Sequence, residues 1–345
     1  MTQACALIAG VAGLELTRDE RAFFKDARPC GLILFLRNCA SHEQIKTLVS
    51  SVKDATGNQG LLVLIDQEGG RVQRLRPPLG RALPPAAVYA GLYKVAPDAA
   101  AGAAFAAARL VANDLRQLGI NTNCAPVLDV PVPGAHDIIG DRAYGAEVQQ
   151  IAALGRAVAK GYMAGGVVPV IKHIPGHGRA LSDSHLDLPV VTASHAELSA
   201  SDFAPFKLLA DMPAAMTAHV VFTAIDKHAP ASTSRTVTEE IIRGEIGFDG
   251  LLMSDDLSMK ALTGAMRTRA EAVIAAGSDV ALHCNGDLVE MQEAASGVPR
   301  LSGDSLRRFY QALAILDSAE DFDQAYCEAI LSGVLAGHTP ATESV

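Results

Sequence analysis

The chain has 345 residues, of which 49% are hydrophobic and 19% are charged. This composition excludes a disordered chain and a small disulfide-stabilised protein, because neither has so large a share of core-forming residues. Aspartate and glutamate outnumber lysine and arginine by 38 to 29, and the resulting net charge of −9 is not typical of proteins that bind nucleic acids or anionic membranes.

Short apolar runs alternate with helical patterns along the chain, and no run of about 18 apolar residues predicts a transmembrane helix. The first run has no basic segment ahead of it, which favours a buried strand over a signal peptide. In chain order, the runs that predict strands are 6–11, 31–36, 61–65, 122–128, 167–171, 215–222, 251–253 and 279–283. The patterns that predict helices are 41–55, 101–118, 148–164, 203–210, 238–244 and 265–276.

The predicted strands are continuously apolar, as strands that are covered on both faces are. Eight strand–helix units in order predict an α/β fold, a single (β/α)8 TIM-type barrel whose regularity the pattern leaves open. We expect this catalytic barrel to span residues 1–336, with extra helices at its C-terminal end, and residues 337–345 to form a flexible tail. A doubly wound open sheet stays an alternative, because periodicity does not detect barrel closure.

The six cysteines are scattered without a C-x-x-C pair, and several lie inside apolar runs. Free thiols in such runs behave as small hydrophobic residues, and reduced thiols are typical of cytoplasmic proteins. We therefore expect the protein to be cytoplasmic.

Polar residues gather directly after the apolar runs, where the C-terminal ends of barrel strands carry active sites. Several such clusters at one predicted rim are difficult to explain by structural needs alone. The clusters that follow the third, fourth, fifth and seventh runs are 66–74, 140–145, 172–178 with 183–187, and 254–259, and His219 lies near the end of the sixth run.

Asp255 follows the seventh run almost at once, so its carboxylate is expected to point into the mouth of the barrel. A structural alternative is a helix N-cap, since aspartate is a favoured capping residue. The neighbouring Asp256 can take that part, which leaves Asp255 for catalysis.

Asp183 and His185 stand two positions apart in a segment rich in glycine and proline, which predicts a loop. An aspartate so placed can hydrogen-bond the imidazole, fix its tautomer and favour its protonated form, which suits general acid–base work near neutral pH. The alternative is a surface Asx-turn beside a histidine without a role, and spacing alone leaves both open.

A metal site is a second interpretation of this region, because imidazole and carboxylate ligands fall within fifteen positions. The spacings H-x-H and H-E-x-x-H are absent, however, and Lys172 would repel a divalent cation. We therefore expect no metal. The residues that this interpretation would use are His173, His177, Asp183, His185 and Asp187.

Lys172 ends the fifth strand and is open to two interpretations. It could form a Schiff base, as in barrel aldolases, or donate hydrogen bonds to substrate oxygens beside His173. Arg74 and Arg142 follow the third and fourth strands, where fixed forks of donors suit a polyhydroxylated ligand. Asp66 would complement them by accepting hydrogen bonds from two sugar hydroxyls.

Three motifs together resemble glycoside hydrolase family three, and within it the single-domain bacterial β-N-acetylglucosaminidases, or β-hexosaminidases. They are KHIPGHG at 172–178 followed after four residues by DSH at 183–185, DQEGGRVQR at 66–74, and SDDLSM at 254–259. The similarity runs in order over roughly residues 5–320. Ile174 stands where the family usually has phenylalanine, which is a change in loop packing rather than in chemistry.

The resemblance implies that Asp255 is the nucleophile and that His185 is the general acid/base, oriented by Asp183. The family's β-glucosidases place an acid/base glutamate on a second domain; none is expected here, which fits the hexosaminidase branch and its histidine-bearing loop. The residues that the resemblance implies for binding N-acetylglucosamine are Asp66, Arg74, Arg142, Lys172 and His173.

With those roles, the resemblance implies a retaining exo-β-N-acetylglucosaminidase that acts through a covalent glycosyl-aspartyl intermediate. The implied substrates are 1,6-anhydro-N-acetylmuramyl-(peptide) muropeptides of cytoplasmic peptidoglycan recycling. No cofactor, metal, nucleic acid, membrane or obligate protein partner is implied. The rivals that stay open are a Schiff-base aldolase that uses Lys172, a metal-dependent hydrolase that chelators would inhibit, and a non-catalytic sugar-binding barrel.

Overall fold

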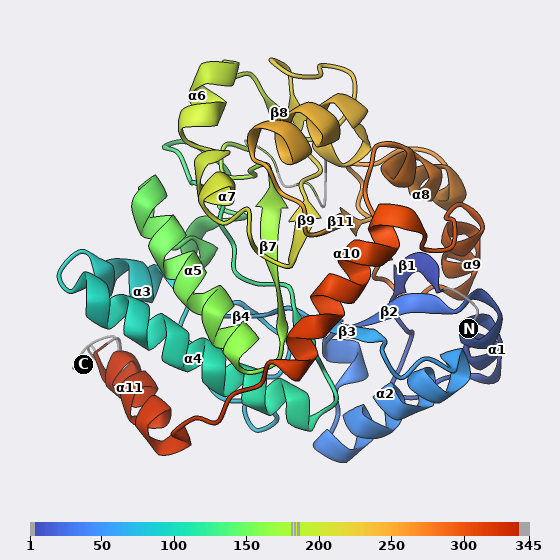
Figure 1. The fold of residues 1–345 in the computed structure, drawn as a ribbon, viewed down its shortest axis with the longest axis horizontal. Helices are drawn as coiled ribbons and strands as arrows, with labels where there is room; N and C mark the ends of the chain where they lie inside the picture. The colour runs from blue at the N-terminus through green and yellow to red at the C-terminus, as the bar shows by residue number, and fades with distance from the viewer. Residues whose placement is uncertain (1–3, 181, 183, 185–186, 338–345) are drawn as a thin grey trace, which may run out of the picture.

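The central element is a barrel, in a computed structural model that describes residues 4–180, 182, 184 and 187–337. Eight strands close into a ring, and each strand pairs with its neighbours in chain order until the last returns to the first (Figure 1). They are β1 (Cys5–Ala9), β2 (Pro29–Leu34), β3 (Leu62–Ile65), β6 (Thr122–Asn123), β7 (Val168–Ile174), β9 (Ala214–Thr217), β11 (Leu251–Asp256) and β12 (Val280–His283).

Parallel pairing around the whole ring settles the fold class. The ring closes between β1 and β12, where Leu7 stands opposite Ala281 and Ala9 opposite His283. All residues of β1, β2, β3, β7, β9 and β12 are buried, as the continuous apolar runs predict. The predicted (β/α)8 TIM-type barrel is confirmed, and the open-sheet alternative is wrong.

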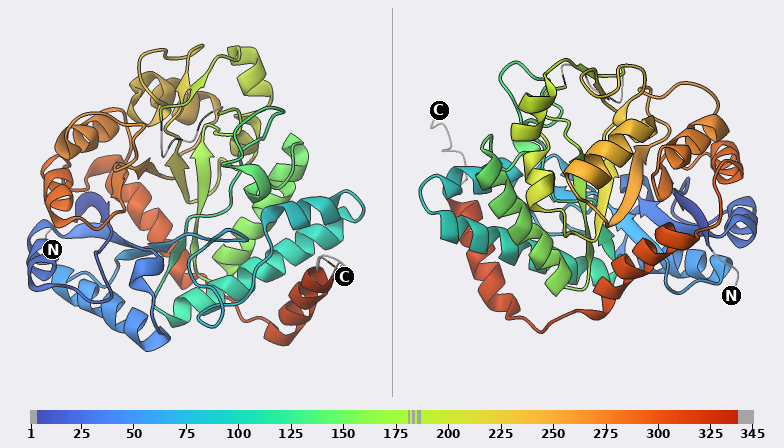
Figure 2. Two further views of the ribbon diagram at one scale, coloured as in Figure 1. Left: turned by 180° about the vertical axis from the view of Figure 1, so that it is seen from behind. Right: turned by 45° about the horizontal axis from the view of Figure 1, so that its top comes forward.

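Helices surround the ring in the alternation that the sequence predicts (Figures 1 and 2). Two further helices, α10 (Gly303–Ala314) and α11 (Gln324–Ala336), follow the last barrel unit and confirm the extra C-terminal helices. The helices that follow the strands are α1 (Arg18–Ala27), α2 (His42–Thr56), α3 (Ala86–Tyr93), α4 (Pro97–Gln117), α5 (Val148–Ala164), α6 (His195–Ala200), α7 (Ala204–Leu208), α8 (Met266–Ala275) and α9 (Leu288–Ser296).

The inside of the ring is filled at its N-terminal end. Leu62, Leu251 and Val280 stand at the first positions of their strands and are fully buried, and Phe309 of α10 belongs to the same cluster. The outer layer is equally close-packed: a Cβ on Gly161 of α5 would come within 2.6 Å of the carbonyl oxygen of Phe105 in α4. This packing leaves the C-terminal end of the ring to the polar side chains.

Two predicted strands are shorter than expected. The run 122–128 gives only the two-residue β6, because Pro126 has no N–H to donate to a strand ladder, and Val127 then forms a single bridge to Lys172. The run 215–222 is split. Its first half is β9, and its second half, β10 (Val221–Phe222), leaves the ring and pairs with β8 (Val190–Val191). A second small sheet joins β4 (Gln67–Gly69) to β5 (Val72–Gln73).

Helix predictions differ from the structure in several places, and helices α3, α6 and α9 have no counterpart in the predicted set. The segment predicted as a helix at 238–244 is a π-helix over Val237–Glu245. Helix α1 is absent from the predicted set, although Thr17 and Glu20 form a capping box whose T-x-x-E pattern is a helix-start signal. Of the expected tail 337–345, only Gly337 lies within the described residues. Within the described part of the chain, no helix is both long and apolar enough to span a membrane.

Candidate active site

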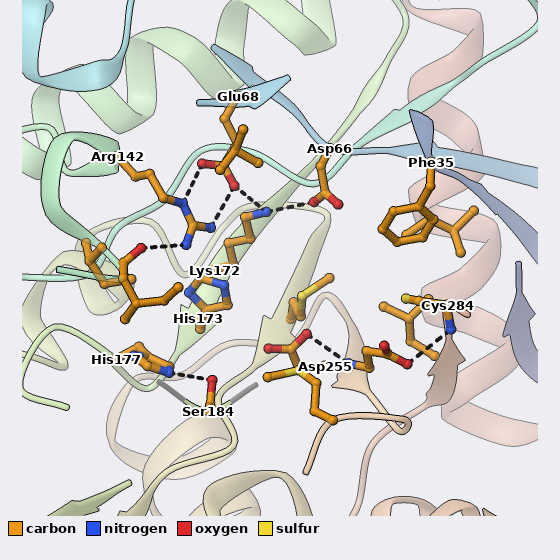
Figure 3. Close-up of a pocket in the computed structure, with 18 of the residues that line it drawn as sticks. Phe35, Asp66, Glu68, Arg142, Lys172, His173, His177, Ser184, Asp255 and Cys284 are labelled. Carbon is orange, nitrogen blue, oxygen red and sulfur yellow. Dashed lines mark hydrogen bonds and ion pairs between the residues drawn. The ribbon is translucent and has the colours of Figure 1, made fainter. Parts of the chain in front are cut away.

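A cavity of about 330 Å³ lies at the C-terminal end of the barrel (Figure 3). Residues on the barrel strands, or directly after them, provide most of its lining. The structure therefore brings together the candidate nucleophile and all five residues predicted to bind substrate. The polar side chains of the lining are Asp66, Glu68, Arg71, Arg74, Arg142, Lys172, His173, His177, Ser184, Asp255 and Asp256.

One wall of the cavity is a network of five charged side chains, which we call the charged wall. Lys172 Nζ lies 2.9 Å from Asp66 Oδ1 and 2.6 Å from Glu68 Oε1. Glu68 also accepts two hydrogen bonds of 2.8 Å from Arg142. Asp66 Oδ2 accepts a hydrogen bond of 2.8 Å from Arg74. Three cations and two carboxylates leave this wall with a net positive charge.

Burial and pairing act on the pKa values of this wall in opposite directions. Burial raises the pKa of Asp66 and Glu68, but Lys172 and the arginines outweigh it. The pKa of Glu68 is held at about 2 and that of Asp66 well below its usual value. Burial lowers the pKa of Lys172, but the two carboxylates outweigh it and hold that pKa above its usual value. These three groups are therefore charged at neutral pH.

Strand β11 ends in two consecutive aspartates with different surroundings. Asp256 Oδ1 accepts hydrogen bonds from the backbone N–H groups of Ser258 (3.0 Å) and Cys284 (3.1 Å), so this carboxylate holds the turn after β11. Asp255 lines the cavity and faces the side on which Lys172 and Asp66 lie (Figure 3). The geometry thus gives Asp256 the backbone-holding part and leaves Asp255 at the cavity.

The segment after β7 is held by a buried aspartate. Asp129 is fully buried, and its Oδ2 lies 2.7 Å from His173 Nδ1. Its Oδ1 accepts hydrogen bonds from the backbone N–H groups of His173 (3.2 Å) and His177 (2.7 Å). Burial raises the pKa of Asp129, but His173 and these donors outweigh it and lower the pKa below its usual value. One ionised carboxylate therefore fixes both histidines.

His177 connects this segment to Ser184, which neighbours the candidate acid/base in the sequence. Its side chain is buried, and its Nε2 lies 3.0 Å from Ser184 Oγ. Burial lowers the pKa of His177 to about 4, so the ring is neutral at pH 7. Asp183 and His185, which flank Ser184 in the sequence, lie outside the described residues.

The remainder of the lining is largely apolar. The guanidinium carbon of Arg74 lies 5.0 Å from the centroid of the Phe35 ring. This cation–π contact connects the apolar side of the cavity to the charged wall. A cavity with one charged and one apolar side suits a sugar, which carries hydroxyl groups around its rim and C–H groups on its faces. The other apolar residues of the lining include Ile33, Met216, Met259, Leu282 and Cys284.

Glu68 and Asp129 received no role from the sequence, although each had a signal. Glu68 stands two positions after Asp66, and alternation along an extended segment would place both on one side. Asp129 follows the apolar run 122–128 directly, so the rule that polar residues after strands line the site already pointed to it. The polar cluster assigned to this run was 140–145, which lies farther along the same loop.

The metal and Schiff-base interpretations find little support in this geometry. Among the described residues, no three histidine, cysteine, aspartate or glutamate side chains are grouped so that they could hold a metal ion. Asp187, one of the candidate ligands, is exposed and accepts a hydrogen bond from the N–H of Leu188. A Schiff base needs a neutral amine, whereas the raised pKa of Lys172 keeps it protonated.

Residues 6–308 match the family described as the glycosyl hydrolase family 3 N terminal domain. A beta-hexosaminidase of Alkalilimnicola ehrlichii is 39% identical over 283 residues, which cover 81% of this chain and 80% of the relative. A beta-hexosaminidase of Bordetella parapertussis is 36% identical over 307 residues, 86% of each chain.

Solved structures give the same result. NagZ from Neisseria gonorrhoeae, in complex with N-trifluoroacetyl-D-glucosamine, superposes with a TM-score of 0.86 at 33% identity, over 96% of this chain and 98% of that one. A glycoside hydrolase family 3 beta-N-acetylglucosaminidase from Paenibacillus sp. has a TM-score of 0.84 at 30% identity, over 95% of this chain and 66% of that one.

Proposed function

The chain belongs to glycosyl hydrolase family 3, and from that premise we propose that it is a retaining exo-β-N-acetylglucosaminidase. The observation that carries the proposal is the position of Asp255. It lies at the end of β11, in the same cavity as Lys172, Arg142 and Asp66. A carboxylate that faces a wall able to bind hydroxyl groups is the arrangement that a glycosidase nucleophile needs.

The charged wall supplies the hydrogen-bonding groups that a sugar requires. Lys172 and Arg142 are donors without acceptor capacity. From the described residues, Asp66 accepts one hydrogen bond on each oxygen, so each oxygen keeps a lone pair for a sugar hydroxyl. All these side chains are held by one another before substrate arrives, so little side-chain entropy is lost on binding. The cavity of about 330 Å³ suits a single terminal sugar, which supports an exo mode of action.

In the first chemical step, an oxygen of Asp255 attacks the anomeric carbon and the bond from that carbon to the leaving oxygen breaks. His185, as the imidazolium, gives its proton to the leaving oxygen. In the second step, water attacks the same carbon, the bond to Asp255 breaks, and neutral His185 takes the proton of the water. Two displacements at one carbon give net retention of configuration.

The finer substrate follows from the resemblance to the single-domain branch of the family. We propose that the leaving group is the 1,6-anhydro-N-acetylmuramyl unit of a muropeptide, with or without its peptide, and that the enzyme acts in the cytoplasm. A Schiff-base aldolase is not favoured, because Lys172 is paired with two carboxylates. A non-catalytic sugar-binding barrel is not favoured either, because Asp255 is retained at the cavity.

The test compares p-nitrophenyl N-acetyl-β-D-glucosaminide with p-nitrophenyl β-D-glucoside, each with and without EDTA. We expect hydrolysis of the N-acetyl substrate, much slower hydrolysis of the glucoside, and no effect of EDTA. Proton NMR of the first product should show the β-anomer before mutarotation. An α-anomer as first product would contradict the covalent intermediate, and loss of activity in EDTA would point to a metal-dependent hydrolase. Turnover of the anhydro-disaccharide, followed by chromatography, tests the finer substrate.

A further inference from the structure

Asp129 is a fully buried side chain near the cavity that takes no part in the proposed reaction. It lies six residues after β6, where the strand ladder has already ended, and its carboxylate has no exposed surface. Three protein N–H groups converge on it: Nδ1–H of His173 and the backbone N–H groups of His173 and His177.

These contacts determine which nitrogen of His173 carries the proton. A carboxylate only accepts hydrogen bonds, so the 2.7 Å contact requires a hydrogen on Nδ1. The other nitrogen, Nε2, is then the ring atom that remains for the cavity, which His173 lines. In the neutral ring, this atom is an acceptor. A neutral His173 with its hydrogen on Nδ1 therefore presents an imidazole acceptor beside Lys172, which can only donate.

We propose that Asp129 is a positioning residue, which fixes the tautomer and orientation of His173 so that Nε2 accepts a hydrogen bond from a hydroxyl group of the bound sugar. The inference rests on the proposed function for the identity of the ligand, but the tautomer itself does not. The same carboxylate holds the backbone of His177, whose ring contacts Ser184. Asp129 therefore also holds the backbone of a segment that precedes the candidate acid/base in the sequence.

The variant Asp129→Asn has the same shape and inverts this arrangement. The two backbone N–H groups need an acceptor, so they hold the amide oxygen on their side. The amide NH2 then faces His173 Nδ1, which must give up its hydrogen to accept from it. The proton moves to Nε2, and the acceptor in the cavity becomes a donor. A comparable substitution of the buried aspartate in a serine-protease triad acts through the wrong histidine tautomer.

Asp279 offers a matched control at the other end of the barrel. It is also a buried aspartate, and it accepts a hydrogen bond from the backbone N–H of Leu252 and from the side chains of Arg243 and Arg308. Asp279→Asn removes the same charge from an equally packed position without touching the cavity. A purely structural role for Asp129 predicts that the two variants behave alike.

The experiment combines nitrogen NMR of the histidine rings with kinetics on p-nitrophenyl N-acetyl-β-D-glucosaminide. The signals of His173 are assigned by their loss in His173→Ala. We expect Nδ1–H in the wild type and in Asp279→Asn, and Nε2–H in Asp129→Asn. We expect kcat/KM to fall roughly ten- to a hundred-fold in Asp129→Asn and to stay unchanged in Asp279→Asn below its melting temperature.

A double-mutant cycle shows whether Asp129 acts through His173. We expect Asp129→Asn to cost at most a few-fold once His173 is alanine, because its target is then absent. Equal losses in both backgrounds would overturn the inference, as would Nε2–H in the wild type. If Asp129→Asn does not fold, the wild-type NMR signal still decides the tautomer. A wild type that does not hydrolyse the substrate would refute the proposed function and leave the tautomer result standing.

Discussion

At the N-terminal end of the barrel, the buried Asp279 has its hydrogen-bonding capacity filled, whereas at the C-terminal end Asp66 keeps part of it. Asp279 accepts four hydrogen bonds, from Arg243, Leu252 N–H, Arg308 and Ser305 Oγ, and a carboxylate has about four acceptor positions. Asp66 accepts hydrogen bonds from Lys172 and Arg74 in the described part of the chain.

The difference shows what separates a structural ion pair from a binding site. Burial and pairing with cations occur at both ends, so neither identifies the site. At the N-terminal end, Arg308 of α10 pairs with Asp279, which directly precedes β12, and Phe309 of α10 packs into the apolar cluster of the ring. At the C-terminal end the partly satisfied carboxylate borders an open cavity. Spare acceptor capacity next to a cavity is therefore the distinguishing property.

Replacing a carboxylate at each end should give the largest contrast. We expect Asp255→Ala to lower kcat by about 10⁴-fold or more, because no other group forms the bond to the anomeric carbon. Its melting temperature should stay close to that of the wild type. Asp249→Ala, which removes a largely exposed partner of Arg307 and Arg308, should leave kcat unchanged. Kinetics and thermal melts of both variants test this, and near-normal turnover by Asp255→Ala would refute the nucleophile assignment.

His185→Ala should give the next largest effect, and the effect should depend on the leaving group. A sugar alkoxide needs a proton in order to leave, so turnover of the disaccharide should fall by about 10²- to 10⁴-fold. A nitrophenolate needs little protonation, so glycosyl-enzyme should form and then accumulate, which gives a burst of nitrophenolate. Asp183→Ala should show a milder form of both changes. Equal losses on both substrates without a burst would place the acid/base elsewhere.

Arginines at the two ends should differ in the quantity that they affect. Arg142→Ala removes a donor from the charged wall and leaves Glu68 with Lys172 as its remaining cation, so we expect kcat/KM to fall roughly ten- to a hundred-fold. Arg308→Ala should lower the melting temperature with no change in kcat/KM, because it binds Asp249 and Asp279 beneath the ring. An unchanged kcat/KM for Arg142→Ala would mean that it does not contact substrate.

Acid should weaken the C-terminal end before the N-terminal end. The pKa of His177 is lowered to about 4 in the folded protein. Between pH 6.5 and pH 4 the unfolded chain therefore binds this proton more tightly than the folded protein, and the free energy of unfolding decreases as the pH decreases. From pH 7 to pH 5 this costs about 2 kcal/mol. The pKa of Asp249 lies at about 2, so its pairing is lost only in stronger acid. Urea unfolding of the wild type and His177→Gln at both pH values measures the difference, which should shrink in the variant.

Much of the fold could be predicted from the sequence, because it depends on local composition and on the order of elements. Each of the eight strands of the ring corresponds to one predicted apolar run. The predicted helix 148–164 has the bounds of α5. What the sequence did not show were departures from regular pairing. The early end of β6 depends on Pro126, and β10 leaves the ring to pair with β8, a partner more than twenty residues away in the chain.

The composition of the site was predictable for a different reason. Strand ends bring Asp66, Lys172 and Asp255 to one rim whatever the loops do, so their positions in the sequence sufficed. Pairings between loops were not predictable. The contact of Arg142 with Glu68 joins residues 74 positions apart, and that of His173 with Asp129 joins residues 44 apart. Because these pairings were not predictable, Glu68 and Asp129 received no role, although Glu68 stands in the cluster 66–74 and Asp129 directly follows the run 122–128.

The ring closes between its first strand and its last, and this sets the order in which the molecule can be assembled. β12 is the shared partner of β1 and β11, and it is the last strand of the ring to be synthesised. Until residue 283 is made, β1 and β11 therefore each lack a neighbouring strand and have an edge of unpaired backbone groups. The N–H of Cys284 is one of the donors that hold Asp256, the neighbour of Asp255. Closure of the ring therefore adds a hydrogen bond that holds the neighbour of Asp255, and a chain that ends before β12 lacks both this bond and a closed barrel.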